Sequence, residues 1–316
     1  MPIGLTAKLL RACISKAGSR DRDVFDMTST EKVRLRAVLG DHPHTRAIKS
    51  GAIASDLVEL EFIPFSPTNT AFKPMVREQK FDVCEMAVVT YLMAKAWKKP
   101  ITLLPAAMLG RYQHAFAVYN VDKGPMTPAS LAGKSVGIRS FTTTTGAWIR
   151  GILANDYGVD LDSIRWVTFE DPHVAEYVAT TERAPAGRNI MQMLTAGELD
   201  AVLGELPSDP KHKPLFADPE AEAEAWCRKR GTVPVNHLVV VTHALADSRP
   251  DVVAEVYRML KASKAMAAAA TPDFVPFGVE ANHRSLELIT GYAAQQKLIP
   301  DRYRVADLFG AAAAFE

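Results

Sequence analysis

Short apolar runs alternate with stretches of helical periodicity along most of the chain. Residues 33–39 alternate apolar with polar side chains and end at Gly40, which is typical of a strand followed by a turn. Residues 67–78 open with Thr and Asn, which are preferred at helix N-caps. The same reasoning predicts strands at 33–39, 57–64, 81–86, 101–105, 114–119, 135–138, 164–169, 199–203 and 235–241, and helices at 45–50, 67–78, 90–97, 147–156, 191–196, 250–270 and 281–296.

Strands that alternate with helices indicate parallel α/β units. A turn cluster at 122–125 (Asp-Lys-Gly-Pro) interrupts the series, and a second series follows it. We therefore expect an α/β protein with two lobes, a hinge near Tyr119 and Asn236, and a ligand cleft between the lobes. The expected parts are an N-terminal extension at 1–30, a discontinuous first lobe at 31–120 plus 236–316, and an inserted second lobe at 121–235.

Composition narrows the class of protein. The 37 Lys and Arg residues against 36 Asp and Glu give a formal charge of +1, which argues against a nucleic-acid partner. The three cysteines are too few and too scattered for a disulfide framework or a CxxC metal site. No export signal is evident, and no run approaches the roughly 18 apolar residues of a membrane span. We expect a cytoplasmic protein with no membrane partner, and by analogy with enzymes of this size a homo-oligomer.

Polar and titratable side chains gather where the predicted strands end. Ligands of open α/β sheets bind beyond the carboxyl ends of the strands, so these positions are candidate site residues. They are His42 and Arg46 after the first strand, Glu85 at 81–86, Arg111 and His114 between 101–105 and 114–119, Arg139 after 135–138, Glu205 after 199–203, and Asn236 and His237 at the second crossover.

The most informative local feature is the run 139–146, Arg-Ser-Phe-Thr-Thr-Thr-Thr-Gly, between a predicted strand and a predicted helix. A helix N-terminus offers free N–H groups and partial positive charge, and an arginine fits a carboxylate. Four threonines exceed what one helix cap needs, although helix capping alone is the alternative interpretation. The candidate anion-binding residues here are Arg139, Thr142, Thr143 and Thr144, and Trp148 on the helix is a candidate wall for an aromatic ligand.

The acid–base candidates each have an alternative interpretation. Glu85 follows an apolar strand pattern, so burial is expected to raise its pKa and make it an acid. An ion pair with Arg46 or Arg111 is the alternative for this carboxylate. The alternative for His114 is a place on a polar rim, and the alternative for His237 is a hydrogen-bonded residue of the core. His42 and His44 have a His-x-His spacing, which is a weak metal signal, so no metal site is predicted and a divalent metal stays open.

Several segments together resemble the 4,5-dihydroxyphthalate decarboxylase family, whose fold is similar to that of type 2 periplasmic binding proteins. The resemblance covers about residues 33–310. It rests on His42 to Arg46, 81–86 (Phe-Asp-Val-Cys-Glu-Met), 148–153 (Trp-Ile-Arg-Gly-Ile-Leu) with 157–159, 164–167 (Ile-Arg-Trp-Val) and 234–237 (Pro-Val-Asn-His). It implies two lobes, each a mixed sheet flanked by helices.

The resemblance also implies a reaction, the non-oxidative loss of CO2 from a dihydroxylated aromatic dicarboxylate to give a protocatechuate-like product. Such an enzyme needs a general acid near the ring carbon, a base near the phenol and cations for the carboxylates. It needs no cofactor in principle. Arg139 and the threonines would hold the retained carboxylate, and the roles of His42, His114, His237 and Glu85 stay unassigned.

Three other functions are compatible with the same sequence. A solute-binding protein of a transporter would use the fold without chemistry. A chorismate-dehydratase-like lyase would also need an anion site and a carboxylate. A ligand-sensing domain is the third, although no DNA-binding helix pair precedes the first strand.

Overall fold

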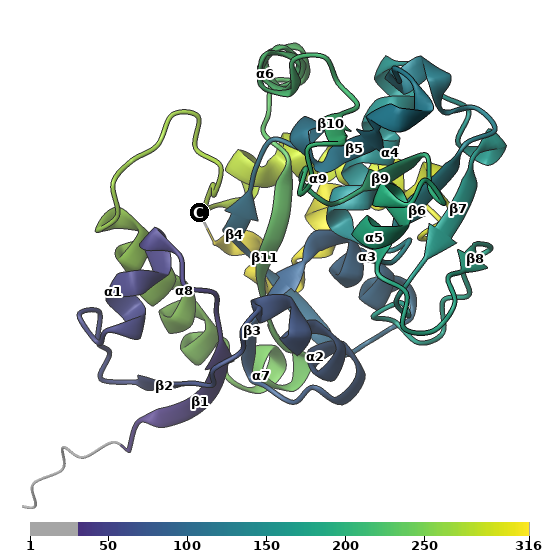
Figure 1. The fold of residues 1–316 in the computed structure, drawn as a ribbon. Helices are drawn as coiled ribbons and strands as arrows, with labels where there is room; N and C mark the ends of the chain where they lie inside the picture. Colours follow the sequence, from purple (N-terminus) through teal and green to yellow (C-terminus); the bar gives the residue numbers. More distant parts are fainter. Residues whose placement is uncertain (1–30, 316) are drawn as a thin grey trace, which may run out of the picture. The chain divides into compact units, whose positions relative to one another are not determined.

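The computed structural model describes residues 31–315; the N-terminal extension predicted at 1–30 lies outside the described residues. The first of two sheets has the strand order β2-β1-β3-β11-β4 (Figure 1). β1 pairs in parallel with β2 and β3, whereas β11 runs antiparallel between β3 and β4. The strand bounds are β1 Val33–Val38, β2 Val58–Phe62, β3 Val83–Ala87, β4 Ile101–Gly110 and β11 Val235–Thr242.

The second sheet has the order β10-β5-β9-β6-β7-β8. Its inner strands β9, β6 and β7 are parallel, and β5 and β10 are antiparallel to their neighbours. β8 extends the parallel part at the edge. The strand bounds are β5 Ala117–Asn120, β6 Ser135–Ile138, β7 Arg165–Thr168, β8 Glu182–Arg183, β9 Ala201–Leu203 and β10 His212–Pro214.

Helices α1 to α6 connect strands, whereas α7, α8 and α9 follow the last strand, β11 (Figure 1). Their bounds are α1 Arg46–Lys49, α2 Phe72–Glu78, α3 Val88–Ala96, α4 Thr144–Asp156, α5 Ile190–Thr195, α6 Pro219–Arg230, α7 His243–Ser248, α8 Pro250–Ala265 and α9 Val279–Gln295. Within the described residues, no helix combines the length and the apolar character that crossing a bilayer requires.

The α/β class and the two-lobed fold with mixed sheets are confirmed. Some elements differ from the sequence expectations. The segment predicted as a strand at 114–119 begins with a 3₁₀ turn, and extended pairing starts only at Ala117. The helix Pro219–Arg230 was not predicted, although Asp218 caps it and Gly231 ends it.

The lobe boundaries themselves stay a prediction. β5 lies before the expected first boundary at residue 120, yet it pairs with β9 and β10 in the six-stranded sheet. β11 returns the chain to the five-stranded sheet after β10 and α6. Two connections therefore pass between the sheets, one after β4 and one before β11.

Helix α4 joins the apolar cores of the two sheets. Trp148 and Ile152, one turn apart, belong to the core of the five-stranded sheet, whereas Ile149 and Leu153 belong to that of the six-stranded sheet. The Trp148 indole N–H also donates a hydrogen bond to the Val235 carbonyl of β11 over 3.0 Å. α4 therefore fixes its own N-terminus with respect to both sheets.

Close packing of α4 against α9 depends on Gly151. A Cβ atom at this position would overlap the Tyr292 ring on α9. We expect Gly151→Ala to lower the free energy of unfolding by about 1–3 kcal/mol, because the ring or the helix must shift. Thermal and urea unfolding measure the effect. Gly291→Ala in α9 is the matched control, since its Cβ would lie no closer than 3.8 Å to Arg302 and alanine favours a helix. Equal stability of both variants would contradict this account of the helix contact.

Candidate active site

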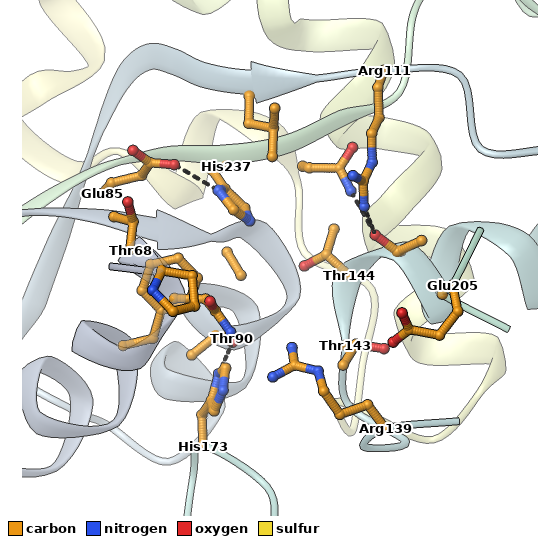
Figure 2. Close-up of a pocket in the computed structure, with 18 of the residues that line it drawn as sticks. Thr68, Glu85, Thr90, Arg111, Arg139, Thr143, Thr144, His173, Glu205 and His237 are labelled. Carbon is orange, nitrogen blue, oxygen red and sulfur yellow. Dashed lines mark hydrogen bonds and ion pairs between the residues drawn. The ribbon is translucent and has the colours of Figure 1, made fainter. Parts of the chain in front are cut away.

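A cavity of about 350 Å³ lies where the two sheets face each other, and side chains from both line it (Figure 2). This volume suits a small organic ligand. Glu85, His237 and Arg111 come from the five-stranded sheet and its ends, and Arg139 and Glu205 follow strands β6 and β9. The sheet-edge rule therefore located most of these side chains correctly.

Glu85 on β3 is a buried carboxylate that three N–H groups contact. Its Oε2 accepts a hydrogen bond from the Gly40 backbone N–H over 2.8 Å and lies 3.0 Å from Nε2 of His42. Its Oε1 lies 2.7 Å from Nδ1 of His237. Burial alone would raise the pKa of Glu85, but the hydrogen bonds from His237 and His42 outweigh it and hold the pKa below its ordinary value. The expectation of a raised pKa is wrong, because the sequence does not show these partners.

His237 on β11 is oriented by that carboxylate. When Nδ1–H donates to Glu85, the other ring nitrogen, Nε2, is free to exchange a proton with a ligand. Figure 2 shows the ring extending from Glu85 into the cavity. The edge-on contact with Phe72, at 5.1 Å between ring centroids, further restricts the ring.

Arg111 and the N-terminus of α4 form a cationic wall. Thr145 Oγ1 accepts hydrogen bonds from Arg111 over 2.8 Å and from Asn236 over 3.2 Å. The Arg111 guanidinium lies 3.8 Å above the Phe116 ring, which fixes its plane. The first N–H groups of a helix have no partner within that helix, so α4 adds donors and partial positive charge here. Of the residues predicted for the anion site, Arg139, Thr143 and Thr144 line the cavity beside this wall, whereas Thr142 does not.

Arg139 supplies a second cation, and Glu205 lies near both arginines. The Arg139 guanidinium is 3.1 Å from Glu170, and both side chains are partly exposed. Burial raises the pKa of Glu205, although the positive charges of Arg139 and Arg111 oppose the change. Glu205 is therefore a carboxylate whose charge is easier to neutralise than that of Glu85.

Four predicted site residues lie away from this cavity. His114 packs in the core against Phe216, at 4.6 Å between ring centroids, and burial lowers its pKa to about 4. Trp148 is fully buried in the core, so its expected role as a wall of the site is not supported. Thr142 is buried beside Ser140, and Arg46 is exposed on α1.

Several cavity residues were not predicted. His173 lies in the loop after β7, and Thr90 Oγ1 is 2.8 Å from its Nδ1. Four residues, Phe-Glu-Asp-Pro at 169–172, separate it from the end of β7, so its place after a strand end was the signal that could have found it. The others that line the cavity and bear polar side chains are Thr68, Asn69, Thr90 and Thr145.

The His-x-His spacing of His42 and His44 left a divalent metal site open. His42 and His44 stack as parallel rings, with centroids 5.0 Å apart. Across residues 31–315, no three His, Cys, Asp or Glu side chains are grouped so that they could hold a metal ion. Cys84 is a buried thiol whose pKa is raised by burial, so it has the character of a packing residue.

The fold is that of a class of binding proteins. The alkanesulfonate-binding protein SsuA from Xanthomonas axonopodis pv. citri, bound to MOPS, superposes with a TM-score of 0.54 at 14% identity, over 89% of this chain and 99% of that one. The periplasmic aliphatic sulphonate binding protein SsuA from Escherichia coli gives 0.52 at 11% identity, over 87% and 91%. At this identity the similarity establishes the fold alone.

Sequence relatives point to an enzyme. A 4,5-dihydroxyphthalate decarboxylase of Comamonas testosteroni is 29% identical over 252 residues, 75% of this chain and 76% of the relative. A 4,5-dihydroxyphthalate decarboxylase of Pseudomonas putida is 27% identical over 213 residues, 62% and 82%. No family model matches the chain. The chain is thus distantly related to these decarboxylases, and the resemblance seen in the sequence is confirmed at that level.

The contacts of Glu85 predict how stability depends on pH. A carboxylate whose folded pKa lies below its unfolded value of about 4.3 stabilises the fold above that pH, and this contribution is lost as the pH falls further. We expect Glu85→Gln to be about 3 kcal/mol less stable than the wild type at pH 7, with a smaller difference at pH 3.5. Urea unfolding at the two pH values measures both differences.

The control is Glu61→Gln, which replaces an exposed carboxylate on β2. Its free energy of unfolding should equal that of the wild type at both pH values. A stability difference for Glu85→Gln that does not change with pH would show that Glu85 is not a charged partner of the two imidazoles.

Proposed function

We propose that this chain is a carboxy-lyase that removes one carboxylate from a hydroxylated aromatic dicarboxylate, with 4,5-dihydroxyphthalate as substrate and protocatechuate as product. The observation that carries the proposal is the Glu85–His237 pair, with 2.7 Å between Oε1 and Nδ1, in a cavity that also holds two guanidinium groups. The two named relatives support this enzyme class.

The cations suit a substrate with two negative charges. Arg111, together with Thr145 and the N-terminus of α4, offers a set of donors for one carboxylate. Arg139 lies on the same cavity and offers a second positive charge. The volume of about 350 Å³ accommodates one aromatic ring with its substituents.

The reaction requires an acid that protonates the ring before CO2 leaves. Direct loss of CO2 from an aryl carboxylate would leave an aryl anion, which is too basic to form. Protonation of the ring carbon that bears the carboxylate avoids this anion. A C–H bond forms first; the C–C bond then breaks, its electron pair returns to the ring, and neutral CO2 leaves. The net change is the uptake of one proton and the release of one CO2.

His237 is the proposed general acid. Glu85 holds the ring through Nδ1, and in the proposed step Nε2–H gives its proton to the ring carbon. Water returns the proton to Nε2 after each turnover. Phe72, Leu109 and Leu203 line the same cavity and exclude part of the water that would otherwise solvate the departing carboxylate.

The proposal predicts turnover by purified, chelator-treated protein. We expect one CO2 and one protocatechuate for each 4,5-dihydroxyphthalate consumed, measured by CO2 release and by the aromatic ultraviolet spectrum. Phthalate, which lacks the hydroxyl groups that activate the ring, is the control and should not react. Tight binding without turnover, with and without divalent metal, would favour a solute-binding protein. Turnover restored only by divalent metal would make His42 and His44 ligand candidates.

Two substitutions should separate acid catalysis from charge recognition. His237→Ala should lower kcat by about 10²–10⁴-fold with a smaller effect on KM, because it removes the acid. Arg139→Met should raise KM by about 10-fold or more, because it removes a charge-assisted hydrogen bond to a carboxylate. Steady-state kinetics measure both values.

The control for charge removal is Arg34→Met, which breaks an exposed pair with Glu59 far from the cavity lining. It should leave both kinetic constants unchanged. Near-wild-type kinetics for His237→Ala and Arg139→Met would contradict the site assignment.

A further inference from the structure

Three histidines line the cavity, and two of them, His237 and His173, have partners that differ in charge. His237 is held by the carboxylate of Glu85, whereas His173 is held by the hydroxyl of Thr90, with 2.8 Å between Oγ1 and Nδ1. Both rings pack edge-on against Phe72, at centroid distances of 5.1 Å and 5.8 Å. The Phe72 ring thus contacts two imidazoles, one with an anionic partner and one with a neutral partner.

His173 is firmly positioned by contacts from the other sheet. It belongs to the loop between β7 and β8, but Arg77 on α2 donates hydrogen bonds to the His173 carbonyl over 2.9 Å and to the Pro172 carbonyl over 2.8 Å. Figure 2 shows the ring directed at Thr90, with Arg139 close to it. Its Nε2 makes no hydrogen bond to any residue in the described part of the chain, while the ring lines the cavity.

The surroundings of His173 keep it neutral. Burial, and then the positive charges of Arg139, Lys73, Arg77 and His237, lower its pKa to about 3. The contact with Thr90 fits the tautomer in which Nδ1–H donates to Oγ1, and in that tautomer Nε2 presents an unshared electron pair. Such a group accepts a hydrogen bond and has no charge with which to bind a carboxylate. The chemistry that it suits is an O–H donor.

We propose that Nε2 of His173 accepts a hydrogen bond from a ring hydroxyl of the substrate and so selects hydroxylated aromatic acids. This inference rests on the proposed function, because it deepens the substrate specificity of the same site. A hydroxyl that donates to His173 gains electron density on its oxygen, and a para hydroxyl passes that density to the carbon that must be protonated. His173 then determines both which rings bind and which rings react.

Binding of ligands that lack a scissile second carboxylate tests the inference without turnover. The probes are 3,4-dihydroxybenzoate and benzoate, measured by calorimetry on the full chain. The wild type should prefer the dihydroxy compound, and His173→Phe should reduce that preference by about tenfold, because the acceptor is lost. His173→Gln retains an acceptor and should keep most of the preference. His283→Phe, an exposed histidine on α9, is the matched control and should bind as the wild type does.

The outcomes separate this inference from the proposed function. An unchanged preference in a folded His173→Phe variant, with folding checked by thermal unfolding, overturns the role of His173 even where the wild type decarboxylates 4,5-dihydroxyphthalate. A lost preference in His173→Phe, with the preference kept in His173→Gln, supports that role even where no turnover is found. An equal loss of this preference in both variants overturns the proposed hydrogen bond to His173 and indicates a packing role for the ring.

Discussion

The structure of the cavity depends on one buried carboxylate. Glu85 is almost fully buried, and burial of an ionised group is costly unless hydrogen bonds compensate for it. The compensation comes from the backbone N–H of Gly40, from His42 and from His237. Gly40 and His42 follow β1, and His237 lies on β11, so the charge is compensated only where β1, β3 and β11 meet in their observed register.

The antiparallel placement of β11 gives this arrangement its geometry. β11 lies between β3 and β4 and pairs His237 with Ala87, two residues from Glu85 on β3. Alternate residues of a strand share a face, so Glu85 and Ala87 point to the same side as His237. The same strand carries Asn236, whose side chain contacts Thr145 at the N-terminus of α4. One strand therefore connects the proposed acid to the cationic wall.

Local patterns in the sequence predicted much of this fold, because strand alternation and helix caps depend on neighbours. The threonine run before α4 was also recognisable, since several polar donors at one helix N-terminus form a local signal. The direction of the Glu85 pKa shift was not predictable, because its hydrogen-bond partners lie 43 and 152 positions away along the chain. His173 was missed for the same reason: its partner Thr90 is 83 positions away.

Charge balance explains how a dianion can enter a cavity that already holds an ionised glutamate. The carboxylate of Glu85 is surrounded by the N–H groups of Gly40, His42 and His237, which reduces its negative potential at the ligand. Arg111, Arg139 and the N-terminus of α4 then act on the ligand from other directions. Glu205 is the remaining acidic group, and its raised pKa lowers the repulsion that a bound carboxylate would meet. In the proposed mechanism the arginines bind the carboxylates of the substrate and the imidazoles act on its ring, and a cavity that only binds anions would not need this separation.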